Sequence, residues 1–376
     1  MQILIAPNAF KNSLSAQLAA RAILDGLRQS RLSFTGECFP IGDGGDGTGG
    51  LIIDRLKGIR IDCVVHDPLG RELQGSIGII ENGQTAVIEM AEASGIKLLK
   101  PEELSPLTAT SYGTGEMMLC ALDHGVRKII LCIGGSATTD GGAGIINALG
   151  VRFLESDGRE LKGMPGSLSR LYQLDLSGLD QRIMNCEIVV LCDVDNPLLG
   201  PQGAAAVFGP QKGADKAAVE KLESGLQQFS AVVLQQTGNR MDTTKHGGAA
   251  GGTAAGLHVL LNAQLVNGID YFLQLTDFES SLEQADWVIT GEGSIDEQTL
   301  NGKGPYGVAC RAKEKNIPVL GLAGKIPLKP TEDLNKYFDI LMAIGNEPTD
   351  LSRALADTAA NLSRTAKGIG DMLSLA

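Results

Sequence analysis

The chain of 376 residues carries little positive charge for its length. Its 32 basic residues face 44 acidic ones, which gives a formal net charge of −12. Nucleic-acid binders rely on a positive surface that attracts phosphates whatever their sequence. We therefore expect no nucleic-acid partner. A phosphate-bearing ligand would have to be met locally by a few Lys or Arg side chains, by backbone N–H groups or by a divalent cation.

The sequence also gives little sign of paired cysteines, and we expect neither a leader nor a membrane span. The seven cysteines are odd in number and form no C-x-x-C spacing, so we expect reduced thiols in a cytoplasmic protein. The first residues lack the basic region and cleavage site of a signal peptide. Residues 247–269 are uncharged, but their glycines, amides and a histidine make a poor bilayer span. No membrane partner is expected.

Several catalytic signatures are absent as well. The sequence contains no G-x-x-x-x-G-K-[ST], no H-E-x-x-H and no nucleophile elbow. The absence of the first of these motifs excludes a P-loop kinase. The four histidines stand alone in the sequence, which favours structural roles for them.

Glycine, in contrast, is abundant. The chain has 49 glycines, where average usage would supply roughly 26. Hydrophobic residues still make up 43% of the chain, which indicates a folded protein with many special loops. The length exceeds the roughly 250–300 residues at which one hydrophobic core stops growing, so two domains are expected.

Apolar patterning predicts the order of the elements. The N-terminal segment has a β-α-β-α order, with strands at 3–6 and 34–41 and helices at 15–27 and from 51. The alternating segments 73–80 and 85–89 flank Asn-Gly and predict an antiparallel hairpin. Further strands are expected at 128–133, 187–192, 286–290, 319–323 and 340–344, and further helices at 113–124, 142–149, 217–234, 306–315 and 351–375.

The two ends of the chain share a β-α texture that the middle lacks. We therefore predict an α/β fold with a doubly wound, Rossmann-like parallel-sheet domain formed by residues 1–59 and 275–376. Residues 60–274 would form an inserted mixed α/β domain. Ligands would bind in a cleft between the two domains.

The first glycine loop is Ile41-Gly-Asp-Gly-Gly-Asp-Gly-Thr48. It satisfies G-x-G-x-x-G between a strand and a helix, which by itself indicates a dinucleotide site. However, Asp43 and Asp46 would repel a pyrophosphate unless a cation intervened. The loop therefore favours metal–phosphate or hydroxy-acid binding, with the backbone of Gly44 and Gly45 free to approach a ligand closely. A tight Asp-Gly turn before a capped helix is the structural alternative.

A second glycine loop, residues 133–144, also follows an apolar strand and precedes a helix. Its backbone N–H groups and the hydroxyls of Ser136, Thr138 and Thr139 are placed to cradle an anion. Asp140 belongs to the same candidate site, although it is equally suited to cap the helix.

Two aspartates follow the expected strand at 187–192. Asp193 and Asp195 stand at i and i+2, so their side chains point the same way if the strand continues. Such a pair suits Mg²⁺ binding or the orientation of a hydroxyl. The sequence Asp-Asn-Pro is also good turn chemistry, which leaves a structural role open for Asp195.

Further polar side chains follow the strand at 286–290. Glu292, Ser294 and Asp296 come where open α/β sheets bind ligands, and Lys303 in the next loop is a cation for a phosphate. Lys11 follows the first strand and would share this edge of the sheet.

Two more cations lie in tight turns. Lys212 stands in Gly209-Pro-Gln-Lys-Gly213, and Arg71 stands in Asp67-Pro-Leu-Gly-Arg71. Either side chain would suit a carboxylate or a phosphate.

The sequence has glycine loops rich in Asp and Thr, a few loop cations and no signature of a covalent nucleophile. This combination suits phosphoryl transfer, which needs positioned reactants, a metal and an oriented hydroxyl. The residues thus favour a metal-dependent kinase of a small molecule.

Six motifs, in order along essentially the whole chain, resemble those of the bacterial type I glycerate kinases. They are Ile5-Ala-Pro-Asn-Ala-Phe-Lys-Asn-Ser13, Ile41-Gly-Asp-Gly-Gly-Asp-Gly-Thr48, Gly134-Gly-Ser-Ala-Thr-Thr-Asp-Gly-Gly142, Cys192-Asp-Val-Asp-Asn-Pro197, Phe208-Gly-Pro-Gln-Lys-Gly213 and Thr290-Gly-Glu-Gly-Ser-Ile-Asp-Glu-Gln-Thr299.

The resemblance implies ATP- and Mg²⁺-dependent phosphorylation of D-glycerate, to 2-phosphoglycerate in many members, by a two-domain α/β protein. Carried over to this sequence, it places Asp43 and Asp46 near glycerate or its metal. Asp193 would be a hydroxyl-orienting base or a metal ligand, and Lys11 and Lys303 would stabilise charge.

Two other functions remain open at this point. One is a Rossmann-type NAD-dependent oxidoreductase of a small hydroxy acid, based on the literal G-x-G-x-x-G. Asp62 fits its ribose-binding position poorly. The other is a hydroxy-acid-binding regulator, for which the sequence offers no basic recognition helix. Which hydroxyl is phosphorylated, and whether the protein is a monomer or a homodimer, are not determined by the sequence.

Overall fold

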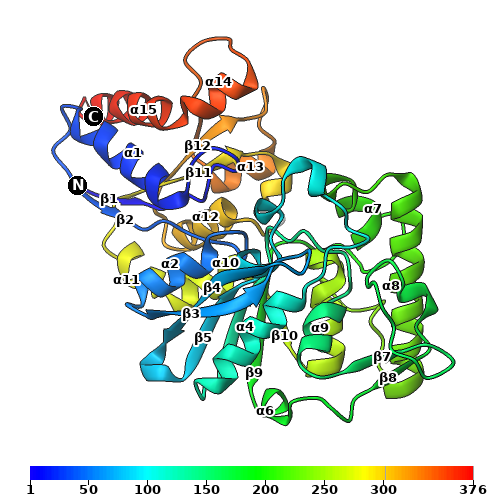
Figure 1. The fold of residues 1–376 in the computed structure, drawn as a ribbon. Helices are drawn as coiled ribbons and strands as arrows, with labels where there is room; N and C mark the ends of the chain where they lie inside the picture. Colours follow the sequence, from blue (N-terminus) through cyan, green and yellow to red (C-terminus); the bar gives the residue numbers. More distant parts are fainter. Residues whose placement is uncertain (301, 376) are drawn as a thin grey trace. The chain divides into compact units, whose positions relative to one another are not determined.

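The structure is a computed structural model that describes residues 1–300 and 302–375 (Figure 1). The chain divides into two compact units. The first comprises Met1–Asp43 and Ile269–Ala376, and the second comprises Gly44–Gly268. Both ends of the chain therefore belong to one unit, and the middle of the chain forms the other.

The chain passes between units at positions other than 59/60 and 274/275, where we expected the domain boundaries. The first passage lies between Asp43 and Gly44 because helix α2 (Thr48–Arg55) packs on strands of the second unit. The second passage lies between Gly268 and Ile269. Ile269 belongs to the first unit, where its side chain fills the space beside Gly307.

The first unit contains a five-stranded sheet with the order β13-β12-β11-β1-β2. Every pairing in it is parallel. The strands are β1 (Gln2–Ile5), β2 (Thr35–Cys38), β11 (Trp287–Ser294), β12 (Val319–Lys325) and β13 (Ile340–Ala343). The winding direction reverses between β1 and β11, and ligands of doubly wound sheets bind outside the carboxyl ends of the strands at such a reversal.

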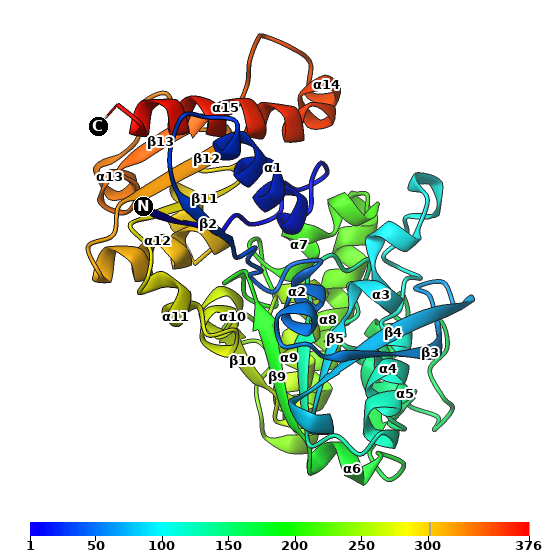
Figure 2. The ribbon, with the colours of Figure 1, turned by 90° about the vertical axis from the view of Figure 1, so that its left-hand side faces the viewer.

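Helices cover this sheet (Figure 2). Ser15 caps α1 by accepting a hydrogen bond from the Leu18 N–H, as expected for a helix that begins after this residue. Helices α1 and α15 pack together and share a core with β1, β11 and β12. The helices of the unit are α1 (Ala16–Arg28), α10 (Gly268–Leu275, whose first residue belongs to the second unit), α11 (Phe278–Leu282), α12 (Gly304–Glu314), α13 (Glu332–Tyr337), α14 (Leu351–Ala356) and α15 (Thr358–Leu373).

The second unit contains a six-stranded mixed sheet with the order β10-β9-β6-β5-β4-β3. The expected hairpin is confirmed, because β4 and β5 pair antiparallel on either side of the Asn-Gly turn. Strands β5, β6, β9 and β10 are parallel neighbours. The strands are β3 (Ile59–His66), β4 (Glu72–Ile80), β5 (Thr85–Glu89), β6 (Lys128–Cys132), β9 (Glu187–Cys192) and β10 (Gln264–Asn267), and β7 (Arg152–Leu154) and β8 (Gln173–Asp175) form a separate pair.

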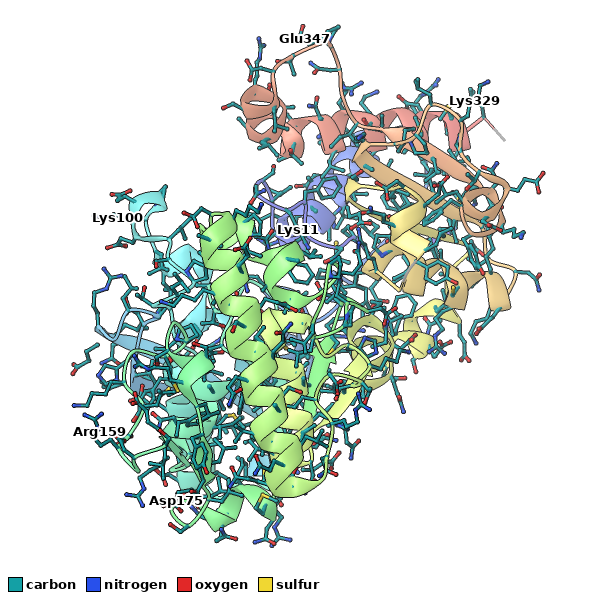
Figure 3. All side chains as sticks on the ribbon, turned by 90° about the vertical axis from the view of Figure 1, so that its right-hand side faces the viewer. Lys11, Lys100, Arg159, Asp175, Lys329 and Glu347 are labelled. Carbon is teal, nitrogen blue, oxygen red and sulfur yellow. The ribbon has the colours of Figure 1, made fainter. Side chains whose placement is uncertain are left out.

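One large apolar core lies between this sheet and the helices of the second unit. The expected long helix at 217–234 is α8, which begins after the capping residue Asp215. Figure 3 shows this helix in light green. The helices are α2, α3 (Ala91–Ser94), α4 (Tyr112–Asp123), α5 (Ala143–Ala148), α6 (Gln181–Met184), α7 (Ala204–Phe208), α8 (Lys216–Thr237) and α9 (Thr253–Leu261), with a 3₁₀ turn at Pro210–Lys212.

The seven cysteines are free thiols, as expected. Four are buried and three are partly exposed. Among the helices of residues 1–300 and 302–375, none is both long enough and apolar enough to cross a membrane.

Candidate active site

Six of the predicted site residues lie in the first unit, after the strands at its reversal point. Lys11 follows β1 and Asp43 follows β2. Glu292 and Ser294 are the last polar residues of β11, Asp296 follows them, and Lys303 is the N-cap of α12. Parallel strands end at the same edge of a sheet, which is where a doubly wound sheet binds ligands.

Asp43 is buried, with 6% of its surface exposed. Its Oδ2 accepts hydrogen bonds from the side-chain amide of Asn8 at 2.7 Å and from the Gly304 N–H at 3.4 Å. Gly304 is the first residue of α12, so the carboxylate lies at the positive end of a helix. These donors hold Asp43 in one place.

Glu292 is also buried, with 8% of its surface exposed. The hydroxyl of Thr299 donates a hydrogen bond to its Oε1 at 2.9 Å. Burial and, to a smaller extent, nearby Asp43 raise the pKa of Glu292 to about 7. Lys303, the Thr299 hydroxyl and Lys11 act in the opposite direction by favouring the charged form. A carboxyl group that titrates near neutral pH is suited to exchange protons with a ligand.

Lys11 and Lys303 supply positive charge close to Glu292. Lys11 is exposed on the loop after β1 (Figure 3). Lys303 is half-buried, and within the described residues neither lysine forms an ion pair. Their charges are therefore available to an anionic ligand.

Ser294 and Asp296 organise the turn that carries Thr299. Asp296 Oδ1 accepts a hydrogen bond from the Gln298 N–H at 2.9 Å, and its N–H donates to the Thr299 hydroxyl at 3.2 Å. The Ser294 hydroxyl lies 3.4 Å from Asp296 Oδ2. These hydrogen bonds stabilise the turn that holds Thr299. Direct contacts of Ser294 and Asp296 with a ligand stay predictions.

The other predicted residues lie in the second unit, and the first glycine loop is the clearest case. The N–H of Gly49, in the first turn of α2, donates to Glu89 Oε1 at 2.7 Å. Burial raises the pKa of Glu89. Its carboxyl group thus occupies the helix N-terminus where a dinucleotide fold binds the pyrophosphate. The strand and helix that flank this loop, β2 and α2, also belong to different units.

Asp46 is exposed and pairs with Lys97 at 3.2 Å. Gly44 and Gly45 approach the second glycine loop very closely. The Gly44 carbonyl accepts a hydrogen bond from the Gly134 N–H at 3.0 Å. A Cβ on Gly134 would lie 2.4 Å from the Gly45 Cα. Close packing between the two loops therefore explains these glycines, and their phosphate contacts stay predictions.

Lys212 lies beneath the second glycine loop, with 3% of its surface exposed. Its ammonium group donates to the Thr138 carbonyl at 2.5 Å and to the Ser136 hydroxyl at 3.0 Å. Burial lowers the pKa of Lys212 to about 7, against an opposing effect of Asp140. The hydroxyls of Thr138 and Thr139 are buried and have no hydrogen-bond partner among the described residues. Buried polar groups of this kind are rare and call for an explanation.

Asp140 has a structural task in this loop. Its carboxylate accepts hydrogen bonds from the N–H and hydroxyl of Ser111, at 2.9 and 2.7 Å, and from the N–H groups of Gly142 and Gly144, at 3.0 and 3.1 Å. Asp140 therefore fixes the start of α5, the alternative left open by the sequence.

Asp193 and Asp195 follow β9. Asp195 is exposed, and its Oδ1 lies 2.9 Å from His246 Nδ1. Among the described residues, no group of three or more His, Cys, Asp or Glu side chains could hold a metal ion. Mg²⁺ commonly binds through one or two carboxylates together with substrate phosphates and water. Two carboxylates at a strand end fit this mode of binding rather than a closed protein cage.

Arg71 pairs with Asp67 at 2.5 Å and with Glu103 at 2.7 Å. Both carboxylates raise the pKa of its guanidinium. The side chain closes the turn after β3, and ligand binding by Arg71 stays a prediction.

Sequence reasoning did not single out Asn8, Thr299, Glu89 or His246. Asn8 and Thr299 lie inside motifs in which sequence reasoning selected charged residues as site candidates instead. The contact of Glu89 with Gly49 spans 40 positions, and no local pattern reveals such a contact.

Comparison with known proteins gives a consistent result over the whole chain. A sequence model of the glycerate kinase family matches residues 3–374. A protein of Bacillus subtilis (strain 168) named glycerate kinase is 44% identical over 376 residues, covering 100% of this chain and 98% of that protein. The glycerate 2-kinase of Escherichia coli (strain K12) is 40% identical over 383 residues, with 100% and 98% covered. A crystal structure from Salmonella typhimurium LT2, assigned to glycerate kinase 2, superposes with a TM-score of 0.82 at 40% identity, with the same coverage.

Proposed function

The chain belongs to the glycerate kinase family, and we propose that it transfers the γ-phosphoryl group of ATP to the 2-hydroxyl of D-glycerate. The product would be 2-phosphoglycerate. The family and the relatives named after this activity support the enzyme class, and the relative named glycerate 2-kinase supports the choice of hydroxyl.

The phosphoryl-transfer chemistry of this proposal is supported by one arrangement of charged side chains in the first unit. Buried Asp43 follows β2 and buried Glu292 lies near the end of β11, and Lys11 and Lys303, which form no ion pair with any described residue, act on Glu292 electrostatically. An acceptor of a hydroxyl proton beside positive charge is what phosphoryl transfer to an alcohol needs, because its transition state spreads negative charge over the transferred group. Asp43, fixed by Asn8, orients the glycerate hydroxyls. Lys11 and Lys303 neutralise the carboxylate of glycerate or the phosphoryl group.

The second glycine loop is proposed to bind a phosphate group. Lys212 lies beneath this loop without a carboxylate partner within hydrogen-bond distance, and the hydroxyls of Thr138 and Thr139 are free donors. A small movement of the loop would turn these groups toward an anion. Ser136 would then exchange its bond from Lys212 for one with the ligand.

Asp193 and Asp195 are proposed to hold Mg²⁺. An ion held there would supply positive charge to offset the negative charge that develops on the phosphates. Asp193 follows the strand directly, and Asp195 Oδ1 lies 2.9 Å from His246 Nδ1. Because no larger group of ligating side chains is found among the described residues, we expect the ion to bind with ATP rather than before it.

The NAD-dependent alternative rested on the G-x-G-x-x-G pattern, and nothing in the comparisons favours it. Glu89 occupies the N-terminus of α2, where the pyrophosphate of NAD would have to bind. We further expect the enzyme to work in the cytoplasm, as a monomer or homodimer.

A direct assay tests the proposed function. The purified protein is incubated with ATP, Mg²⁺ and D-glycerate, ADP release is followed, and ³¹P NMR identifies the phosphoglycerate. We expect stoichiometric ADP and 2-phosphoglycerate, no turnover with L-glycerate, and loss of activity when EDTA removes the metal. ADP release together with 3-phosphoglycerate would contradict the choice of hydroxyl. Absence of ADP release, with reduction of NAD⁺ by glycerate, would overturn the kinase itself.

A further inference from the structure

Glu292 has one carboxyl oxygen that the protein leaves open. Oε1 accepts a hydrogen bond from Thr299, whereas no described residue donates to Oε2. Although the residue as a whole is only 8% exposed, Oε2 is not among the side-chain atoms of the described residues that are both buried and without a hydrogen-bond partner. This oxygen is therefore accessible at the ligand-binding edge of the sheet, where a ligand can contact it.

The charged groups around Glu292 have both signs. Lys303 approaches from the start of α12, Lys11 from the loop after β1, and Asp43 from the loop after β2. Asp296 lies in the turn that also carries Thr299. The lysines favour a charged Glu292, while burial and Asp43 favour the protonated form. Because these influences oppose each other, the carboxyl group can gain and lose a proton near neutral pH.

We propose that Glu292 is the general base of the reaction, a role for which sequence reasoning considered Asp193, as either the base or a metal ligand. This inference rests on the proposed glycerate kinase function. As the glycerate hydroxyl oxygen bonds to the γ-phosphorus of ATP, its O–H bond breaks and the proton passes to Glu292 Oε2. The bond from the γ-phosphorus to the bridging oxygen breaks, and its electron pair remains on ADP. The proton on Glu292 then leaves to solvent.

The other candidate carboxylates are less suited to this step. Asp43 Oδ2 accepts bonds from Asn8 and Gly304, which fix it as an orienting acceptor. Asp195 is exposed and lies beside His246, and Asp193 is proposed to bind Mg²⁺. Glu292 alone among these groups combines burial, an open oxygen and a pKa of about 7.

Thr299 is a positioning residue for this base. Its hydroxyl donates a hydrogen bond to Oε1 and so restricts the rotation of the carboxyl group. The hydrogen bond also favours the charged form of Glu292, so it lowers the pKa of the carboxyl group. Removing the hydroxyl should therefore raise the pKa of Glu292, so that less of the carboxyl group is ionised at neutral pH and the pH range in which it acts as a base moves upward.

The test compares Glu292→Gln with wild type and with Glu297→Gln, a matched change of an exposed glutamate in the same turn. We expect Glu292→Gln to lower kcat about 100-fold or more, with a KM for glycerate within about 3-fold of wild type. Wild-type kcat should fall below about pH 7 as Glu292 becomes protonated. This acidic limb should vanish in Glu292→Gln and persist in Glu297→Gln.

Thr299 provides a second, conservative series. Thr299→Val should lower kcat about 10-fold and move the acidic limb to higher pH, and Thr299→Ser should restore both. If wild type makes 2-phosphoglycerate while Glu292→Gln keeps its kcat within about 3-fold and retains the acidic limb, Glu292 is not the base. If folded wild type makes no phosphoglycerate from ATP and glycerate, the proposed function itself fails.

Discussion

The side-chain amide of Asn8 lies 2.7 Å from Asp43 Oδ2 and joins the segments that follow β1 and β2. The two strands are parallel neighbours, so residues that follow them meet at the same edge of the sheet. The side-chain oxygen of Asn8, Oδ1, accepts a hydrogen bond from the Ala9 N–H at 2.8 Å. The amide is thus fixed from both ends, and it fixes the carboxylate in turn.

Asp43→Asn should lower kcat about 100-fold or more, because a neutral amide at this position no longer holds a substrate hydroxyl through a charged acceptor. Asn8→Ala should cause a smaller loss of about 10-fold, since the carboxylate remains but is free to rotate. Steady-state kinetics with ATP and D-glycerate measure both effects. Asp25→Asn, on the exposed face of α1, is the control and should match wild type. Wild-type kinetics in Asp43→Asn would remove this residue from the mechanism.

The titration of Glu292 should also appear in the stability of the protein. Its pKa is raised to about 7 in the folded state, so the folded protein binds more protons than the unfolded chain between about pH 4.5 and 7. The free energy of unfolding therefore falls as pH rises through this window. Relative to Glu292→Gln, wild type should lose up to about 1.4 kcal/mol per pH unit. Urea unfolding at pH 5, 6 and 7 measures the difference, and a constant difference across these values would contradict the raised pKa.

Much of the fold could be predicted because its signals are local. Alternating apolar residues on either side of Asn-Gly predict the β4–β5 hairpin, and Ser15 before an apolar pattern predicts α1. The pair β7–β8 and strand β10 were missed because three or four residues carry too little periodicity. The helix after the first glycine loop, α2, was predicted, but its membership of the second unit was not. Which unit contains α2 depends on its packing against β4 and β5 rather than on its own sequence.

The candidate site could be predicted as a set of loops rather than as a set of contacts. Strand ends and glycine loops pointed to Asp43, Glu292 and Lys212. Whether a charged side chain stabilises the fold or contacts a ligand depends on its hydrogen-bond and ion-pair partners, which can lie far away in the sequence. Asp140 is held by Ser111, 29 positions earlier, and Arg71 by Glu103, 32 positions later. Such partners satisfy a charge without leaving a pattern in the sequence.

Gly251 should be required for the shape of the second glycine loop. Its φ is +68°, and a Cβ would lie 2.1 Å from the Thr138 carbonyl oxygen, the atom that accepts a bond from Lys212. Gly238 has a similar φ of +75° but open space around it. Gly238→Ala should cost about 1 kcal/mol of unfolding free energy through backbone strain alone. Gly251→Ala should cost at least about 2 kcal/mol more and lower kcat, because the loop must shift. Equal losses in the two variants would show that the contact is unimportant.

Lys212 should make stability rise with pH. Burial lowers its pKa to about 7 in the folded state, whereas the unfolded chain keeps an ordinary lysine near 10.4. Between these values the unfolded chain binds the extra proton, so the free energy of unfolding increases as pH rises. Lys212→Met, of similar length but without a titrating group, lacks this contribution. The stability of wild type relative to Lys212→Met should therefore grow by up to about 1.4 kcal/mol per pH unit between pH 7 and 10, measured by urea unfolding.

Lys216→Met, on the exposed start of α8, is the control and should show no such trend. A parallel course of wild type and Lys212→Met over this range would mean that the amine stays protonated when buried, held by Asp140 and the Thr138 carbonyl.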